Sequence, residues 1–151
     1  MLLDLIDSQT NPTIATYAKT KEVHIRVTAR AETDEEAKKI LKPVVKEIKK
    51  RFGNAVYTTD ENETLEDVVV RLLTKYDLTV TTAESCTGGL LAGRLVNVPG
   101  ASEVFRQGFI TYSNKAKRKQ LDVSKTTLRK YGAVSEQTAK EMATGGVFAT
   151  D

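Results

Sequence analysis

The stretch Thr81-Thr82-Ala83-Glu84-Ser85-Cys86-Thr87-Gly88-Gly89 marks a sharp corner between a strand and a helix. An apolar, β-branched run over Leu78–Ala83 stops at polar residues, and a helical pattern follows over Leu90–Val96. Unpaired backbone N–H groups and the positive end of the helix dipole gather at such a corner. This suits an activated nucleophile beside a site for negative charge. The local sequence alone favours a plainer role, in which Ser85 or Thr87 is the helix N-cap.

A second polar motif, Thr111-Tyr112-Ser113-Asn114-Lys115-Ala116-Lys117, follows a strand that we expect over Gly108–Ser113. Because the carboxyl ends of parallel strands meet at one edge of a sheet, we expect this motif to share a crevice with Ser85. A hydroxyl needs a base to become nucleophilic, and the only histidine, His24, lies on a strand face in the other half of the chain. These observations favour Lys117 as the base.

A serine, a lysine and a tyrosine hydroxyl are sufficient to hydrolyse an amide. In this hypothesis Ser85 attacks, Lys117 removes its proton, and Tyr112 relays a proton to the leaving group. Backbone N–H groups around Cys86 to Gly88 would hold the oxyanion.

Most of these residues also have a structural explanation. Cys86 is more typical of a small buried hydrophobe than of a nucleophile, since no base is identifiable for it. Glu84 could be a catalytic carboxylate, but such a residue more often binds helix N–H groups. The pair Gly88-Gly89 could serve only close helix–strand packing. Four neighbouring basic residues most simply form a solvated helix face, although together they could contact a phosphate: Lys115, Lys117, Arg118 and Lys119.

The first part of the chain, to about Asp60, is predicted to be a β-α-β unit. Glu22–Arg30 alternates as a half-buried strand, with Val23, Ile25, Val27 and Ala29 on one face and His24, Arg26, Thr28 and Arg30 on the other. A helix should begin at a capping box over Thr33–Glu36 and end at Gly53, with Pro43 kinking it or shortening its first half. The second strand is predicted at Ala55–Thr58, and Thr59–Glu63 is the candidate linker.

Strands and helices alternate in the second part, which predicts an α/β layer. An amphipathic helix is expected over Thr64–Tyr76, with Leu65, Val68, Val69, Leu72 and Leu73 facing inward. Further helices are expected over Asn114–Leu121, Lys125–Tyr131 and Ser135–Thr144. Only two strands accompany them, fewer than a stable sheet normally needs, so we expect the chain to carry an incomplete second domain.

Composition narrows the possible partners. The 23 basic and 20 acidic residues give a net charge of +3, and only nine residues are aromatic, so we expect no nucleic-acid partner. A single cysteine fits a reducing compartment, and no apolar run reaches the length of a membrane span, so we expect a cytoplasmic protein without membrane contact. No cluster has metal-ligand spacing, so no metal is expected.

Four motifs in one order resemble the CinA family of competence/damage-inducible proteins. They are Ala83–Gly89, Pro99-Gly100-Ala101-Ser102, Thr111–Lys117 and Gly132-Ala133-Val134-Ser135. The upstream segments Asp7–Thr13 and Glu22–Arg26 are similar to the KH-like module of that family. The resemblance implies an α+β KH-like module over 1–60, followed over 61–151 by part of a three-layer α/β nicotinamide mononucleotide (NMN) deamidase domain.

The resemblance also implies a reaction, in which NMN and water give nicotinate mononucleotide and ammonia without a cofactor. Ser85 matches the nucleophile of the family, Lys117 the general base and Tyr112 the supporting hydroxyl. The turn of Glu84, Cys86, Thr87, Gly88 and Gly89 is implied to bind substrate. The chain stops before a Thr-Gly-Ile-Ala-Gly-Pro motif at which the family's domain continues, which again predicts an incomplete domain.

The alternative hypothesis is an interaction module for nucleic acid or protein, linked to competence and DNA damage. It rests on the KH-like unit, which lacks the Gly-x-x-Gly loop that KH folds use to clamp nucleotides. A third possibility is that this unit is structural and orients the deamidase domain or mediates self-association. We expect a homo-oligomer, because an incomplete sheet exposes an edge strand.

Overall fold

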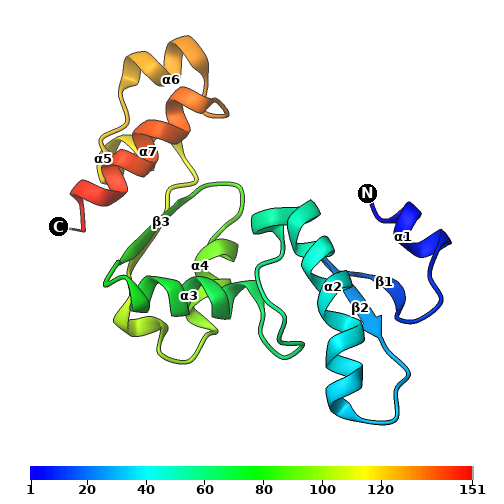
Figure 1. Cartoon of the computed structure of the whole chain (residues 1–151). Helices are drawn as coiled ribbons and strands as arrows, with labels where there is room; N and C mark the ends of the chain where they lie inside the picture. The colour runs from blue at the N-terminus through cyan, green and yellow to red at the C-terminus, as the bar shows by residue number, and fades with distance from the viewer. Residues whose placement is uncertain (151) are drawn as a thin grey trace. The chain divides into compact units, whose positions relative to one another are not determined.

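The computed structural model describes residues 1–150 and divides the chain into two compact units, Met1–Thr59 and Asp60–Asp151 (Figure 1). Both units combine helices with a small sheet, so the predicted α/β class is confirmed.

The first unit has the order α-β-β-α. Helix α1 (Leu3–Asp7) precedes strands β1 (Thr13–Lys19) and β2 (Glu22–Thr28), which pair antiparallel and are followed by α2 (Asp34–Phe52). The predicted β-α-β order is therefore wrong. Ala55 ends the short 3-10 helix η1 (Gly53–Ala55), and no strand follows it within the described part of this unit. Strand β1 was not predicted, because Ile14 is its only buried side chain and its sequence therefore shows no alternation of apolar and polar residues.

Residues from all four main elements form the core of the first unit. Leu2, Ile14 and Ile48 are buried, and half-buried apolar residues surround them: Leu5, Ile6, Ile25, Val27, Val44 and Phe52. Val23 is 63% exposed, which corrects its expected place on the inner face. It lies opposite the exposed Ala18 at the turn end of the hairpin, away from the Ile14–Val27 pair that reaches the core.

Helix α2 continues through Pro43 as one element, so Pro43 does not shorten it. Its N-cap is Thr33, whose side chain accepts a hydrogen bond from the Glu36 backbone N–H at 3.3 Å. Near the other end, Arg51 donates two hydrogen bonds to the carboxylate of Asp4, at 2.6 and 2.7 Å. These bonds join α1 to α2, and they lower the pKa of Asp4 to about 2.

The second unit places helices on both faces of a two-stranded parallel sheet. Strands β3 (Val80–Glu84) and β4 (Phe105–Ile110) pair so that Glu84 lies opposite Ile110. Helices α3 (Leu65–Lys75) and α4 (Leu90–Val96) share a core with the 3-10 helix η2 (Ala101–Glu103). In Figure 1 these helices lie on one side of β3, and α5 (Asn114–Leu121), α6 (Lys125–Tyr131) and α7 (Glu136–Phe148) lie on the other. This agrees with the expected three layers.

The cores on the two faces have different residues. On the α3–α4 face, the buried residues are Val70, Leu95, Ala101 and Val104. On the α7 face, they are Phe109, Leu121, Val123 and Met142. Gly146 of α7 lies directly against this face of the sheet, since a Cβ built on it would be 3.1 Å from Thr81 and 3.8 Å from Ala83. Strand β3 therefore has no exposed residue, whereas in β4 only Phe109 is buried.

Helix α3 presents most of the face expected, with two exceptions. Val68 is buried as predicted, but Leu65 and Leu72 are 42% and 39% exposed and Val70 is buried instead. Val69 and Leu73, both expected inside, pack with Val70 on the residues of α4 and η2. The inner stripe therefore extends to Val70 and leaves out Leu65 and Leu72.

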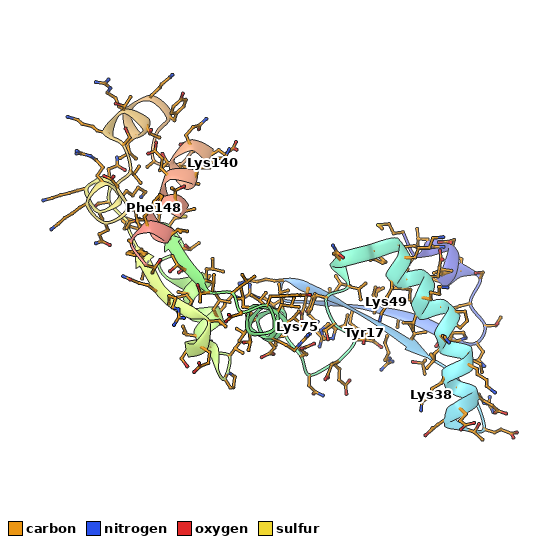
Figure 2. All side chains as sticks on the ribbon, turned by 60° about the vertical axis from the view of Figure 1, so that its left-hand side comes forward. Tyr17, Lys38, Lys49, Lys75, Lys140 and Phe148 are labelled. Atoms are coloured by element: carbon orange, nitrogen blue, oxygen red, sulfur yellow. The ribbon has the colours of Figure 1, made fainter. Side chains whose placement is uncertain are left out.

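Two element boundaries also differ from the sequence expectation. Strand β4 begins at Phe105 and ends at Ile110, so Tyr112 lies beyond the strand and not within it. Helix α7 runs on to Phe148 instead of ending at Thr144, because Gly145 and Gly146 lie inside it. In Figure 2, the labelled Lys140 lies in the first half of this helix and Phe148 at its C-terminal end.

Candidate active site

The structure brings Ser85 and Lys117 into contact. Ser85 is the first residue after β3, and Lys117 lies on α5, one turn after the Ser113 N-cap. The Lys117 Nζ and Ser85 Oγ atoms are 2.9 Å apart, within hydrogen-bond distance. Residues that are 32 positions apart therefore meet at the carboxyl edge of the sheet, as the sequence motifs predicted.

Backbone oxygens complete the surroundings of the Lys117 amine. The side chain is 1% exposed, and Nζ also donates to the carbonyl oxygens of Thr111, at 2.8 Å, and Tyr112, at 3.3 Å. None of the ion pairs found over residues 1–150 includes Lys117. The three oxygens can accept all three N–H bonds of an ammonium. In a neutral amine, two N–H bonds can stay on the carbonyls while the lone pair faces the Ser85 hydroxyl.

The turn between β3 and α4 leaves two N–H groups next to the nucleophile candidate. Gly88 N–H donates to the Ser85 carbonyl at 3.1 Å, so it is not available to a substrate. The N–H groups of Cys86 and Thr87 have no acceptor within the part of the chain that the structure describes. Of the oxyanion donors expected in Cys86–Gly88, the N–H groups of Cys86 and Thr87 therefore remain available, and that of Gly88 does not. Gly88 and Gly89 have φ values of 60° and 95°, a conformation that favours glycine.

Ser85 and Thr87 do not cap α4. The N-cap of this helix is Gly89, which has no side chain to offer, and Ser85 lies four residues earlier. The structural explanation that the local sequence favoured is therefore wrong. The hydroxyl of Ser85 contacts the Lys117 amine instead.

The carboxylate of Glu84 binds the first N–H groups of α4, a role that the N-cap residue Gly89 cannot fill because it has no side chain. It is 5% exposed, and its Oε2 and Oε1 atoms accept hydrogen bonds from the backbone N–H groups of Leu91, at 3.0 Å, and Ala92, at 2.9 Å. Burial raises the pKa of Glu84, but these two donors, with the Thr87 hydroxyl and the Gly89 N–H, outweigh burial and hold the pKa below its usual value. Glu84 thus remains ionised at neutral pH.

Replacing Glu84 by glutamine should lower the free energy of unfolding at pH 7 by about 1–3 kcal/mol, because an amide NH₂ cannot accept the helix N–H bond. The pKa of Glu84 is lower in the folded state, so its contribution is complete above the ordinary carboxyl pKa of about 4.3 and is lost as the pH falls through the folded value. Urea unfolding at about pH 7 and about pH 3 should show the difference between the two proteins shrinking in acid. An equal difference at both pH values would contradict this prediction.

The remaining predicted site residues are more exposed. Tyr112 is 76% exposed, and its hydroxyl has no partner within residues 1–150; only its carbonyl contacts Lys117. Cys86 is an exposed free thiol, which corrects the expectation of a buried hydrophobe. It lies in the turn itself, outside both cores of the unit.

Sequence reasoning missed the part that Thr111 plays. This residue is fully buried, its N–H donates to the Glu84 carbonyl at 2.8 Å, and its own carbonyl accepts from Lys117 Nζ. The only signal for it was its place at the head of the second motif. A backbone contact of this kind leaves no residue-type preference that a single sequence reveals.

Within residues 1–150, no group of three or more His, Cys, Asp or Glu side chains lies close enough together to hold a metal ion. No helix in the same range has both the length and the apolar character needed to cross a membrane.

The fold and the site define a class of α/β protein. In it, a serine at the end of one parallel strand meets a buried lysine on the helix that follows the neighbouring strand. Residues 62–150 match the family described as the CinA C-terminal domain, and residues 1–58 match the damage-inducible protein CinA KH domain. The chain belongs to the CinA family, which confirms the resemblance found in its motifs.

Relatives from several bacteria are similar over nearly the whole chain. A putative competence-damage inducible protein of Clostridium novyi is 57% identical over 94% of this chain and 34% of its own length. A CinA-like protein of Kosmotoga olearia is 54% identical over the same shares of the two chains. The chain thus spans about a third of the length of these curated relatives.

Solved structures resemble part of the chain. The competence/damage inducible protein CihA from Agrobacterium tumefaciens has a TM-score of 0.55 and 49% identity, over 56% of this chain and 51% of its own. A CinA superfamily protein from Escherichia coli has a TM-score of 0.55 and 38% identity, over 62% and 56%.

Proposed function

We propose that the second unit carries the nucleophile and base of an amidohydrolase that converts NMN and water to nicotinate mononucleotide and ammonia. The observation that carries the proposal is the 2.9 Å contact between Ser85 Oγ and the buried Lys117 Nζ. Membership of the CinA family, whose C-terminal domain matches residues 62–150, supports the choice of substrate, because the motifs of this chain resemble the NMN deamidase domain of that family.

The reaction would begin at the Ser85 hydroxyl. Oγ attacks the carboxamide carbon of the nicotinamide ring while its proton passes to the neutral Lys117 amine. The carbonyl oxygen becomes an oxyanion, which the N–H groups of Cys86 and Thr87 are placed to stabilise. The C–N bond then breaks, the departing nitrogen takes the proton, and ammonia leaves an ester on Ser85.

Water would complete the cycle. Lys117, neutral again, removes a proton from a water molecule that attacks the ester carbon, and the Ser85 oxygen leaves with that proton. We assign to Tyr112 the role of relaying protons to the leaving nitrogen, because its exposed hydroxyl is free to contact a ligand. Nicotinate mononucleotide is released and no cofactor is consumed.

Ammonia release from NMN tests this proposal. The assay compares this chain with a version that continues into the remainder of the Clostridium novyi relative, because the chain matches only 34% of that protein. We expect ammonia and nicotinate mononucleotide in equal amounts from the extended version at least. If neither version releases ammonia from NMN, the proposal is wrong.

A further inference from the structure

We propose that Glu84 is a positioning residue for this reaction. Its buried carboxylate fixes the turn that presents the Ser85 hydroxyl to Lys117, without contacting the substrate. The inference rests on the proposed function of the Ser85–Lys117 pair. It gives a defined role to a charged group that the reaction steps do not use.

The carboxylate holds the far end of the turn that begins beside it. Glu84 precedes Ser85 directly, while its two oxygens bind the N–H groups of Leu91 and Ala92, at 3.0 and 2.9 Å. Residues 85–89 therefore form a loop whose start and end are joined through one side chain. Gly89, the N-cap, cannot make this connection itself because it has no side chain.

Two further polar groups of the turn act on the same carboxylate. The Thr87 hydroxyl and the Gly89 N–H also help to hold the pKa of Glu84 below its usual value, after the N–H groups of Ala92 and Leu91. The N–H groups of Cys86 and Thr87 are not consumed by these interactions. The bonds from Leu91 and Ala92 thus hold the turn while leaving free the two N–H groups that the oxyanion requires.

The main chain of Glu84 is connected to the other partner of the pair. Its carbonyl accepts from Thr111 N–H at 2.8 Å and from Thr111 Oγ1 at 3.4 Å. The Thr111 carbonyl in turn accepts from Lys117 Nζ at 2.8 Å. Ser85 and Lys117 are therefore both linked to Glu84, one by the peptide bond and the turn, the other through Thr111.

Direct contact between Glu84 and a substrate does not fit the geometry. The residue is 5% exposed, and each carboxylate oxygen already binds a backbone N–H group. A substrate contact would have to displace bonds from the first turn of α4. An effect of Glu84 on the reaction must therefore act through the position of Ser85.

The test uses Glu84→Ala in the extended version of the protein, with and without added sodium formate. We expect kcat for NMN to fall about 100-fold with KM changed by less than about threefold, because a displacement near 1 Å of a reacting group has an effect of this size. Formate is small enough to replace the lost carboxylate at Leu91 and Ala92. It should restore kcat by about tenfold or more, on the same scale of effect.

Glu141→Ala is the matched control. Glu141 Oε2 accepts from the Ser124 N–H at 2.8 Å, so this carboxylate also binds the start of a helix, away from Ser85. Its removal should leave kcat unchanged, and added formate should not change the kcat of this variant. Wild-type kcat in folded Glu84→Ala, or a loss that formate does not restore, would overturn the proposal.

A second readout separates this inference from the proposed substrate. A fluorophosphonate reagent reacts with activated serines, so its rate of labelling at Ser85 can be measured without NMN. We expect slower labelling in Glu84→Ala and in the more conservative Glu84→Gln, which serves if the alanine variant does not fold. Should the wild type label at Ser85 yet leave NMN unchanged, the substrate assignment fails while the labelling rates still decide the role of Glu84. Equal labelling rates in wild type and variants would overturn it.

Discussion

Replacing Lys117 by methionine should lower kcat for NMN hydrolysis by roughly two to four orders of magnitude, the usual contribution of a general base. Methionine keeps an unbranched side chain in the buried position but can neither accept the Ser85 proton nor return it to the leaving nitrogen. Ser85→Ala should reduce the rate at least as much, because it removes the attacking atom. Steady-state kinetics on the extended version of the protein measures both effects.

The control for Lys117→Met is Lys119→Met on the same helix. Lys119 is exposed, and residues two positions apart do not share a helix face. Figure 2 shows side chains with nitrogen ends extending outward from α5. This variant should keep the wild-type kcat. A fall in kcat for Lys119→Met comparable with that for Lys117→Met would mean that helix charge, and not the Ser85–Lys117 contact, is responsible.

Gly145→Ala should destabilise the second unit by about 3 kcal/mol or more, at the upper end of overpacking effects. A Cβ built on Gly145 would lie 2.0 Å from the Leu121 carbonyl oxygen and 2.6 Å from its carbonyl carbon. Since both atoms are backbone, no rotamer change relieves the clash, and α5 and α7 must move apart. Urea unfolding followed by circular dichroism would give the difference in the free energy of unfolding.

Gly93→Ala provides the comparison for this substitution. Gly93 lies inside α4, and a Cβ built on it meets nothing within 4 Å. Here alanine should stabilise by about 0.5–1 kcal/mol, as it does at open positions in helices. If Gly145→Ala were as well tolerated as Gly93→Ala, the close approach of α7 to α5 would be contradicted.

Local sequence signals predicted several elements of the second unit closely. The ranges of α4, α5 and α6 agree with expectation because α5 and α6 begin after serine N-caps and α4 begins after Gly89 and ends before Asn97. The end of α7 could not be predicted, because Gly145 and Gly146 look like a helix stop in sequence. They remain helical because each lies against a neighbouring element, which is a tertiary effect. Strand β1 was missed for a related reason, since pairing with β2 and not apolar alternation maintains it.

The candidate site was predictable only in part. The absence of a second histidine directed attention to Lys117, and the two motifs at strand ends placed it near Ser85. The contacts of Glu84 with Leu91 and Ala92, and of Thr111 with Lys117, depend on backbone groups that every residue possesses. The sequence therefore suggests which side chains react, whereas the structure shows which backbone groups hold them.

The most direct measurement of the central claim is a search for the acyl group on the protein. The extended version is mixed with NMN, quenched in acid within its first turnovers, and digested for peptide mass spectrometry. We expect the nicotinoyl ribonucleotide to be esterified to Ser85 and to be absent from Lys117→Met. Turnover of NMN with Ser85 unmodified, or with the adduct on the exposed thiol of Cys86, would contradict the account.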